Sequence, residues 1–127
     1  MSAGQIILYA LVAIFLLIYI RKSVLRMLIK QYTPTKLAKE MELGTVVVLD
    51  VREDKERSVS HIQGDIHIPI KQLLKDWDKL SKHKHKEIVC YCQTGTRSLV
   101  AATRLKKLGF KVANLSGGMG EWNYYYR

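Results

Sequence analysis

The sequence is poor in cysteine, because only Cys90 and Cys92 among its 127 residues carry a thiol. A structural disulfide between these two is geometrically awkward, since a single residue separates them. The chain is therefore not a disulfide-stapled scaffold, and it suits a reducing compartment. Internal repeats and low-complexity segments are also lacking. Residues 33–127 are enough for one modest hydrophobic core, so a second globular domain does not fit.

Acidic residues are absent before Glu40, and the chain begins instead with a long apolar run. As a helix, Ala3–Ile20 would span about 27 Å at ~1.5 Å per residue, slightly short of a ~30 Å hydrocarbon core. Snorkelling of Arg21 and Lys22 can supply the difference. The run therefore predicts a transmembrane anchor over residues 1–22. A cleaved signal peptide is the alternative, but no basic residue precedes the run and no small-x-small cleavage site follows it.

Positive charge is concentrated directly after the apolar run. Six basic residues precede the first acidic one: Arg21, Lys22, Arg26, Lys30, Lys36 and Lys39. Because positive segments stay inside, we expect a single-pass protein of the cell membrane with the rest of the chain in the cytoplasm. The net charge of +10 is then explained mostly by the orientation in the membrane and by contact with anionic membrane lipid, and it does not imply nucleic-acid binding. Residues 23–32 are expected to form a basic juxtamembrane helix or a solvated linker.

The most informative segment is the loop around the second cysteine. Glu87–Tyr91 is typical of a short buried strand, and Arg97–Leu108 carries apolar residues at helical spacing. The loop that joins this strand to this helix, with the start of the helix, consists of Cys92, Gln93, Thr94, Gly95, Thr96, Arg97 and Ser98. Backbone N–H groups can curl inward here, and the helix adds its positive dipole end. Both effects would stabilise a thiolate and lower the pKa of Cys92 below ~8.5, which makes Cys92 the candidate nucleophile.

Apolar and amphipathic segments alternate through the rest of the chain. Strands are expected over Thr45–Val51, Asp65–Ile68, Glu87–Tyr91 and Lys111–Leu115. Helices are expected from Pro34 to Gly44 with Thr33 as N-cap, then over Glu53–Ser58, Lys71–Leu80 and Arg97–Leu108. The third of these should direct Leu73, Leu74, Trp77 and Leu80 inward. This alternation predicts an α/β fold with a parallel sheet covered on both faces.

Four landmarks, in this order, resemble the rhodanese family of sulfurtransferases. They are Val46–Arg52, which ends in Asp-x-Arg; His61–Gly64 followed by Ile68–Pro69; the Cys92 loop; and Leu115–Met119 with Glu121–Trp122. Their order over residues 33–122 is a far more specific signal than the cysteine loop alone. The resemblance implies a rhodanese-like domain over residues 33–127, with a central parallel sheet of about five short strands and helices on both faces.

The same resemblance implies a sulfur-transfer reaction at Cys92. Its thiolate would attack the outer sulfur of thiosulfate or a persulfide, hold that sulfur as a covalent persulfide, and release it to cyanide or an acceptor thiol. The amides of the loop would bind the terminal sulfur as an oxyanion hole does, which makes these the expected substrate-binding residues: Gln93, Thr94, Gly95, Thr96, Arg97 and Ser98. No general base, cofactor or metal is expected. Gln93 stands where well-studied thiosulfate enzymes often carry a basic residue, so a protein persulfide or thiol partner is an alternative to thiosulfate.

Individual side chains around the loop have competing roles. Arg97 either touches substrate or braces the loop against an acidic residue. Thr94, Thr96 and Ser98 can donate hydroxyl hydrogen bonds or cap the helix, and capping is the role expected for Ser98. Asp50 and Arg52 are expected to tie the surrounding loops together by hydrogen bonds. Cys90 should pack in the core.

Two other function classes are weighed against sulfur transfer. Cysteine phosphatases and arsenate reductases of this fold use Cys-x5-Arg, because a phosphate-sized oxyanion needs a wider cradle. Here Cys92 and Arg97 have the spacing Cys-x4-Arg, which suits a single sulfur atom. A non-catalytic, membrane-tethered binding module is the remaining alternative, and the retained Cys92 argues against it. His61 is expected in a structural turn, and the His83–Lys86 run in a solvated turn rather than a metal site.

Overall fold

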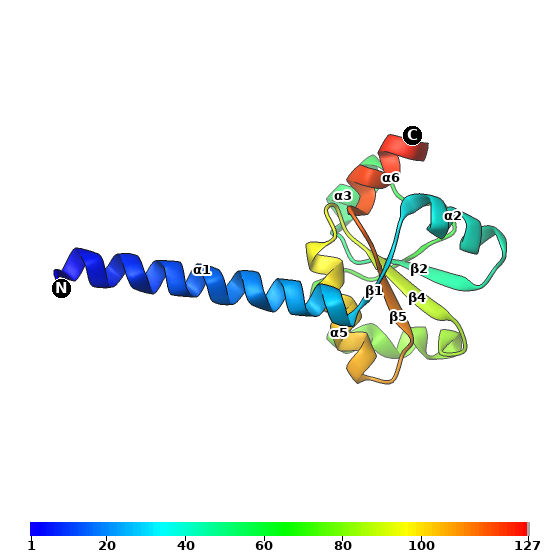
Figure 1. The fold of residues 1–127 in the computed structure, drawn as a ribbon. Coiled ribbons are helices and arrows are strands. Elements are labelled where there is room, and N and C mark those ends of the chain that lie inside the picture. Colours follow the sequence, from blue (N-terminus) through cyan, green and yellow to red (C-terminus); the bar gives the residue numbers. More distant parts are fainter. Residues whose placement is uncertain (127) are drawn as a thin grey trace.

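The computed structural model describes residues 1–126 as one long helix followed by an α/β domain (Figure 1). The helices are α1 (Ala3–Leu28), α2 (Pro34–Glu42), α3 (Asp54–Val59), α4 (Ile70–Asp76), the 3-10 helix η1 (Trp77–His83), α5 (Thr96–Lys107) and α6 (Gly118–Tyr126). The strands are β1 (Lys30–Tyr32), β2 (Val46–Asp50), β3 (Ile66–His67), β4 (Glu87–Tyr91) and β5 (Val112–Leu115).

The five strands form one parallel sheet in the order β1-β5-β4-β2-β3. Its central strand β4 pairs with β2 from Val46↔Glu87 to Asp50↔Tyr91, and with β5 on its other side. Because all strands run the same way, the loops that follow them gather at one edge of the sheet. The predicted α/β fold with about five parallel strands is confirmed.

Helices cover both faces of the sheet, as a parallel sheet requires. On one face Leu73 of α4, Leu80 of η1 and Leu99 and Leu105 of α5 pack in the same buried cluster as Cys90 of β4. The other face holds a second cluster, with Leu37 of α2 and Met119 of α6 over Tyr32, Val89, Tyr91 and Leu115. The side chains of β4 therefore alternate between two separate cores.

The predicted helix over Lys71–Leu80 is wrong in its second half. The α-helix ends at Asp76, and the chain continues as a 3-10 helix. A 3-10 helix has fewer residues per turn, so the register of the side chains changes at this point. Leu73 and Leu80 are buried as expected, while Leu74 points outward with 61% of its surface exposed.

Strand β1 was not anticipated from the sequence. Residues 23–32 were expected to be a helix or a linker, and α1 does continue to Leu28. Lys30–Tyr32 then adds an edge strand, pairing Lys30 with Ala113 and Tyr32 with Leu115. Lys106 of α5 donates a 3.1 Å hydrogen bond to the carbonyl of Leu28, which satisfies one of the free carbonyls at the end of α1.

Helix α1 stands apart from the domain along most of its length (Figure 1). None of its residues is buried, although Leu25 packs against the core beside Ile29. Its N-terminus is closed by a capping box between Ser2 and Gln5. By length and composition α1 is apolar enough to cross a membrane.

Candidate active site

The cysteine loop follows β4 at the edge of the sheet where the parallel strands end. Cys92 comes directly after Tyr91, the last residue of the strand, and α5 begins at Thr96. The turn between them depends on Gly95, whose φ of +99° lies in the left-handed region that favours glycine. The chain thus passes from strand to helix within a few residues, which aims the first N–H groups of α5 at the cysteine.

The Cys92 sulfur lies inside this curl, where backbone N–H groups and a hydroxyl face it. The backbone N–H of Gly95 donates to Sγ at 3.1 Å, and the Ser98 hydroxyl lies 3.3 Å from it. Burial of the thiol opposes ionisation, but hydrogen bonds from the Ser98 hydroxyl and from the backbone N–H groups of Ser98, Gly95 and Thr94 outweigh it. The pKa of Cys92 is therefore lowered, as the sequence predicted.

Helix α6 fixes the back of the loop. The backbone N–H of Met119 donates to the carbonyl of Cys92 at 2.8 Å, and that of Gly120 donates to the carbonyl of Gln93 at 3.1 Å. Gly118 permits this approach, because a Cβ at that position would lie 2.3 Å from the Cys92 carbonyl oxygen. With these two carbonyls held outward by α6, neighbouring N–H groups of the loop are free to face the sulfur.

Arg97 braces the loop in this structure. Its guanidinium forms two hydrogen bonds with the Glu56 carboxylate of α3, at 2.6 and 2.8 Å. The hydrogen bonds from Arg97 are the main reason why the pKa of Glu56 falls to about 2. Of the two roles expected for Arg97, this geometry corresponds to the structural one.

The Asp50–Arg52 pair ties the loops together, as expected. Arg52 is fully buried and donates to Asp50 from Nε at 3.0 Å and from Nη2 at 3.1 Å. It also donates to the Ser60 carbonyl at 2.7 Å and to the Gln93 side-chain oxygen at 3.3 Å. Hydrogen bonding to Arg52 outweighs burial, so the pKa of Asp50 is lowered and the pair stays charged. Arg52 thus connects β2, the segment after α3, and the cysteine loop.

Ser98 does not cap α5, so that prediction is wrong. The N-cap position belongs to Gly95, with no side-chain hydrogen bond, and Ser98 lies within the first turn of the helix. Its hydroxyl instead lies 3.3 Å from Cys92 Sγ and 2.5 Å from Asn114 Oδ1. Asn114 was missed, although a polar residue within the apolar strand β5 is itself a signal of a buried polar contact.

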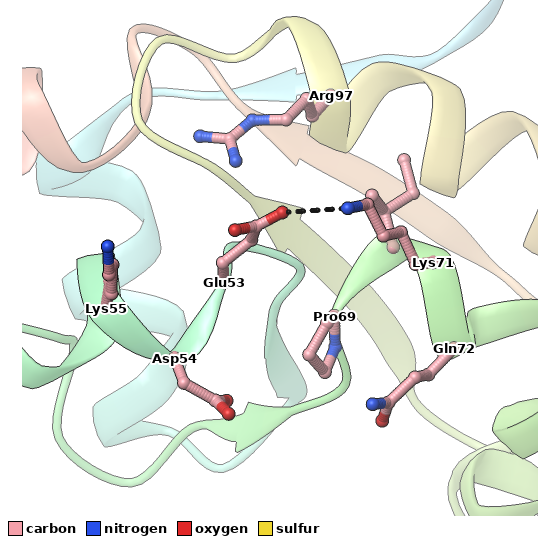
Figure 2. A pocket seen from close by; sticks show the side chains of 8 residues that line it. Glu53, Asp54, Lys55, Pro69, Lys71, Gln72 and Arg97 are labelled. Carbon is pink, nitrogen blue, oxygen red and sulfur yellow. Dashed lines mark ion pairs between the residues drawn. The ribbon is translucent and has the colours of Figure 1, made fainter.

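The remaining loop residues lie nearer the surface. Gln93 and Thr94 are exposed, and Thr96 is half-buried. A pocket of about 480 Å³ opens between the starts of α3 and α4, with Arg97 on its wall and a 3.4 Å ion pair between Glu53 and Lys71 across it (Figure 2). The pocket adjoins the loop without including Cys92, whose side chain is only 1% exposed.

The other candidates from the sequence lie away from this chemistry. Cys90 is completely buried, and burial, followed by the charge of Cys92, raises its pKa to about 12. His61 is exposed, in the turn where the N–H of Ile62 donates to the Tyr91 hydroxyl at 3.1 Å. No cluster of three metal-ligating side chains occurs among residues 1–126.

Several known proteins are similar to this chain. The Bacillus subtilis protein named "Putative sulfurtransferase YtwF" is 33% identical over 95 residues, which cover 74% of this chain and 90% of that protein. "Putative sulfur carrier protein YrkF" of the same organism is 42% identical over 76 residues, or 59% of this chain. That match covers only 40% of its relative's length. A crystal structure of a rhodanese-related protein from Thermoplasma volcanium superposes with a TM-score of 0.70 at 29% identity, covering 76% of this chain and 93% of the other.

The match to a family extends over almost the whole α/β domain. The model of the rhodanese-like domain matches residues 33–124, from the N-cap of α2 into α6. This range contains all four sequence landmarks, the cysteine loop among them, and most of the helix that supports this loop. On this match and the shared fold, the chain belongs to the rhodanese-like family.

Proposed function

We propose that this protein is a membrane-anchored rhodanese-type sulfurtransferase that carries sulfane sulfur on Cys92. The observation that supports this most directly is the position of the Cys92 sulfur, 3.1 Å from the N–H of Gly95 inside the loop. An incoming sulfur atom bonded to Sγ would place its negative charge near the same N–H groups. The similarity to relatives named sulfurtransferase and sulfur carrier points to the same chemistry.

The reaction has two steps at this site. The Cys92 thiolate attacks the outer sulfur of the donor, a Cys92 S–S bond forms, and the donor's own S–S bond breaks. The leaving group, sulfite from thiosulfate or a thiolate from a persulfide, departs with the electron pair. An acceptor thiolate or cyanide then attacks the outer sulfur, and Cys92 leaves as a thiolate. Cys92 thus returns to its starting state without a general base.

A phosphatase reaction is less well supported by this geometry. A phosphate-sized oxyanion needs a guanidinium that faces it, and here the Arg97 guanidinium is engaged by Glu56. The loop also has the shorter Cys-x4-Arg spacing. Both features favour a single sulfur atom as the transferred group.

The charges around the pocket favour a persulfide over thiosulfate as donor. Of the three basic side chains on the pocket wall, Lys71 is paired with Glu53 and Arg97 with Glu56, which leaves Lys55 outside the ion pairs of the described residues. Gln93, the exposed loop residue next to Cys92, is neutral. A dianion such as thiosulfate therefore meets few free cations here, whereas a thiol or protein persulfide does not require them.

For the anchor, we propose a single transmembrane segment over residues 1–22 with the rhodanese-like domain over residues 33–127 in the cytoplasm. The apolar composition of α1 and the six basic residues that follow it before the first acid support this topology. The same basic residues would contact anionic lipid headgroups. Protease added to intact cells should then spare a C-terminal tag and degrade it only after lysis. Degradation in intact cells would reverse the assigned topology.

Mass spectrometry of the purified full chain after incubation with a sulfur donor tests the activity. We expect a gain of about 32 Da, one sulfur atom, on the peptide that contains Cys92, and release of thiocyanate when cyanide is added. Cys92→Ser should abolish both signals, and the matched variant Cys90→Ser should retain them. Thiocyanate release by Cys92→Ser would refute the proposed nucleophile.

A further inference from the structure

A buried asparagine on β5 is connected to the cysteine through the Ser98 hydroxyl. Asn114 is 3% exposed and lies one strand away from Cys92. Its side chain reaches the underside of the cysteine loop, where Oδ1 is 2.5 Å from Ser98 Oγ. Ser98 Oγ in turn lies 3.3 Å from Cys92 Sγ. Asn114 does not touch the sulfur and reaches it only through the residues it contacts. Ser98 is the one of these residues that shares a hydrogen with it, while Gly95 is held through its carbonyl.

The orientation of the Asn114 amide is fixed by its other contacts. Its Nδ2 donates to the Gly95 carbonyl at 3.3 Å and to the Gln31 side-chain oxygen at 3.1 Å. A flipped amide would bring Oδ1 against the Gly95 carbonyl, which can only accept. The amide oxygen of Asn114 is therefore the atom that faces Ser98, and it needs a donor there because it is buried.

The Ser98 hydroxyl has one hydrogen and two possible acceptors. When it donates to Asn114, its oxygen can accept the S–H of a neutral Cys92 thiol. A Cys92 thiolate has no hydrogen, so Ser98 must then turn and donate to the sulfur. Doing so leaves the buried Asn114 oxygen without a donor, which carries a free-energy cost.

We propose that Asn114 is a positioning residue of the cysteine site. Its amide oxygen accepts the Ser98 hydrogen while Cys92 is a neutral thiol, and Ser98 turns this hydrogen to the sulfur when Cys92 becomes a thiolate. Once sulfur is bound, the negative charge moves to the outer sulfur atom and the inner sulfur is neutral. Ser98 can then donate to Asn114 again. The network thus opposes the free thiolate more than the persulfide. This inference rests on the proposed role of Cys92 as the reactive thiol.

Charged and titratable groups elsewhere near the sulfur do not replace this contact. Arg97 lies on the first turn of α5 but is paired with Glu56, and Cys90 on β4 stays neutral because burial raises its pKa. Arg26 of α1 borders a small surface pocket that it shares with Gly95 and Asn114. These groups are unchanged by substitution of Asn114, so their influence cancels when variants are compared.

The test is the pH dependence of Cys92 alkylation by iodoacetamide, followed by mass spectrometry on the full chain in detergent. Asn114→Ala and Asn114→Leu remove the competing acceptor, so the apparent pKa of Cys92 should fall by about half to one pH unit in both. Ser98→Ala should raise it. In the Ser98→Ala background, the Asn114 substitutions should no longer lower the apparent pKa of Cys92, because the shared hydrogen is gone. Any effect that is left there comes from the lost contact with the Gly95 carbonyl.

The measurement distinguishes a change in the pKa of Cys92 from unfolding and from a loss of sulfur transfer. Buried Cys90 reports folding within the same spectra, since its alkylation would reveal an unfolded variant. The measurement uses no sulfur donor, so a failed sulfur-transfer assay would count against the proposed function without touching this inference. An unchanged or raised apparent pKa in both folded Asn114 variants would overturn the inference. An equal fall with and without Ser98 would overturn it as well.

Discussion

The two cysteines have the same side chain and similar burial, but a strand and the loop that follows it shift their pKa values in opposite directions. Cys90 and Cys92 are two residues apart, and both are at least 99% buried. Cys90 lies within β4 among apolar neighbours, and its pKa is raised to about 12. Cys92 lies one residue beyond the strand, where a hydroxyl and backbone N–H groups face its sulfur, and its pKa is lowered. Burial alone therefore does not decide whether a thiol is reactive; the donors that face it do.

The widest gap between the two cysteines should appear in their rates of alkylation at pH 7. With a pKa of about 12, Cys90 has a thiolate fraction on the order of 10⁻⁵, whereas an unperturbed thiol, with a pKa of ~8.5, already has one on the order of 10⁻². The pKa of Cys92 is lowered, so we expect Cys92 to react at least ~10³-fold faster. Peptide mass spectrometry after brief iodoacetamide treatment measures both sites in one sample. Comparable labelling of the two sites in folded protein would show that the loop does not activate Cys92.

Gly118→Ala should remove the special environment of Cys92 while leaving Cys90 in place. The new Cβ would lie 2.3 Å from the Cys92 carbonyl oxygen, so α6 must move and release the loop. We expect a destabilisation of roughly 2–4 kcal/mol and loss of most of the fast alkylation of Cys92. Gly44→Ala is the matched control, because φ is +69° there but nothing lies within 4 Å of the added Cβ. Its cost should be about 1 kcal/mol, measured by urea denaturation, with normal alkylation.

Glu56→Gln tests whether bracing by Arg97 contributes to the loop. The carboxylate has a pKa of about 2 in the folded chain and 4.5 in a free side chain, so its stabilising effect is complete above pH 4.5 and is lost as the pH falls toward 2. Since both side chains are about a third exposed, we expect the variant to lose under ~1 kcal/mol of folding stability. Its sulfur transfer should be a few-fold slower. Urea denaturation between pH 2 and 6 should show a flatter acid limb in the variant.

Asp76→Asn is the matched control for that experiment. Asp76 also pairs with a basic residue, Lys79 at 3.6 Å, but it lies at the end of α4 in a pair that does not involve the cysteine loop. Its acid limb and sulfur transfer should match those of the unmodified chain. If both variants slow sulfur transfer equally, the Glu56–Arg97 pair has no special role at the loop.

The smallest effect on the reactivity of Cys92 is expected for Cys90→Ala. The substitution removes a buried sulfur atom from the core cluster, which should cost about 1 kcal/mol of stability. The alkylation rate of Cys92 should stay within about twofold, because the donors to its sulfur come from the loop and α5. A large fall in that rate would mean that the two thiols act together, and the distinction between them would have to be abandoned.

The sequence allowed most of the fold to be predicted, because each long element carried its own pattern. The buried strand Glu87–Tyr91 and the Thr33-Pro34 helix start lie where they were expected. Strand β1 was missed because three residues with one buried side chain, Tyr32, have no readable period. Leu74 is exposed although it lies in the α-helical part of its segment, beside buried Leu73, and its spacing did not show which of these two neighbours faces the core.

At the site, local chemistry could be predicted and contacts between distant segments could not. The position of Cys92 between strand and helix follows from patterns of neighbouring residues. The partners Glu56, Asn114 and Gly118 are 36, 22 and 26 positions away from Cys92 in sequence, and they meet the loop only because parallel strands share one edge. Ser98 was assigned to capping because its side chain can serve either function, and only the position of Asn114 distinguishes the two.

The junction between α1 and the domain restricts how far the cysteine loop can move relative to α1. Helix α1 continues about 9 Å beyond Lys22 without a break, and Lys106 holds its last turn against α5. A domain joined in this way to a membrane helix has little slack, in contrast to one on a flexible tether. In the membrane-anchored enzyme proposed above, the loop would therefore stay at a nearly constant distance from the membrane surface. It would meet its partners by lateral diffusion in the plane of the bilayer. Acceptors fixed to the same bilayer would meet it at a raised effective concentration, without any new contact between them.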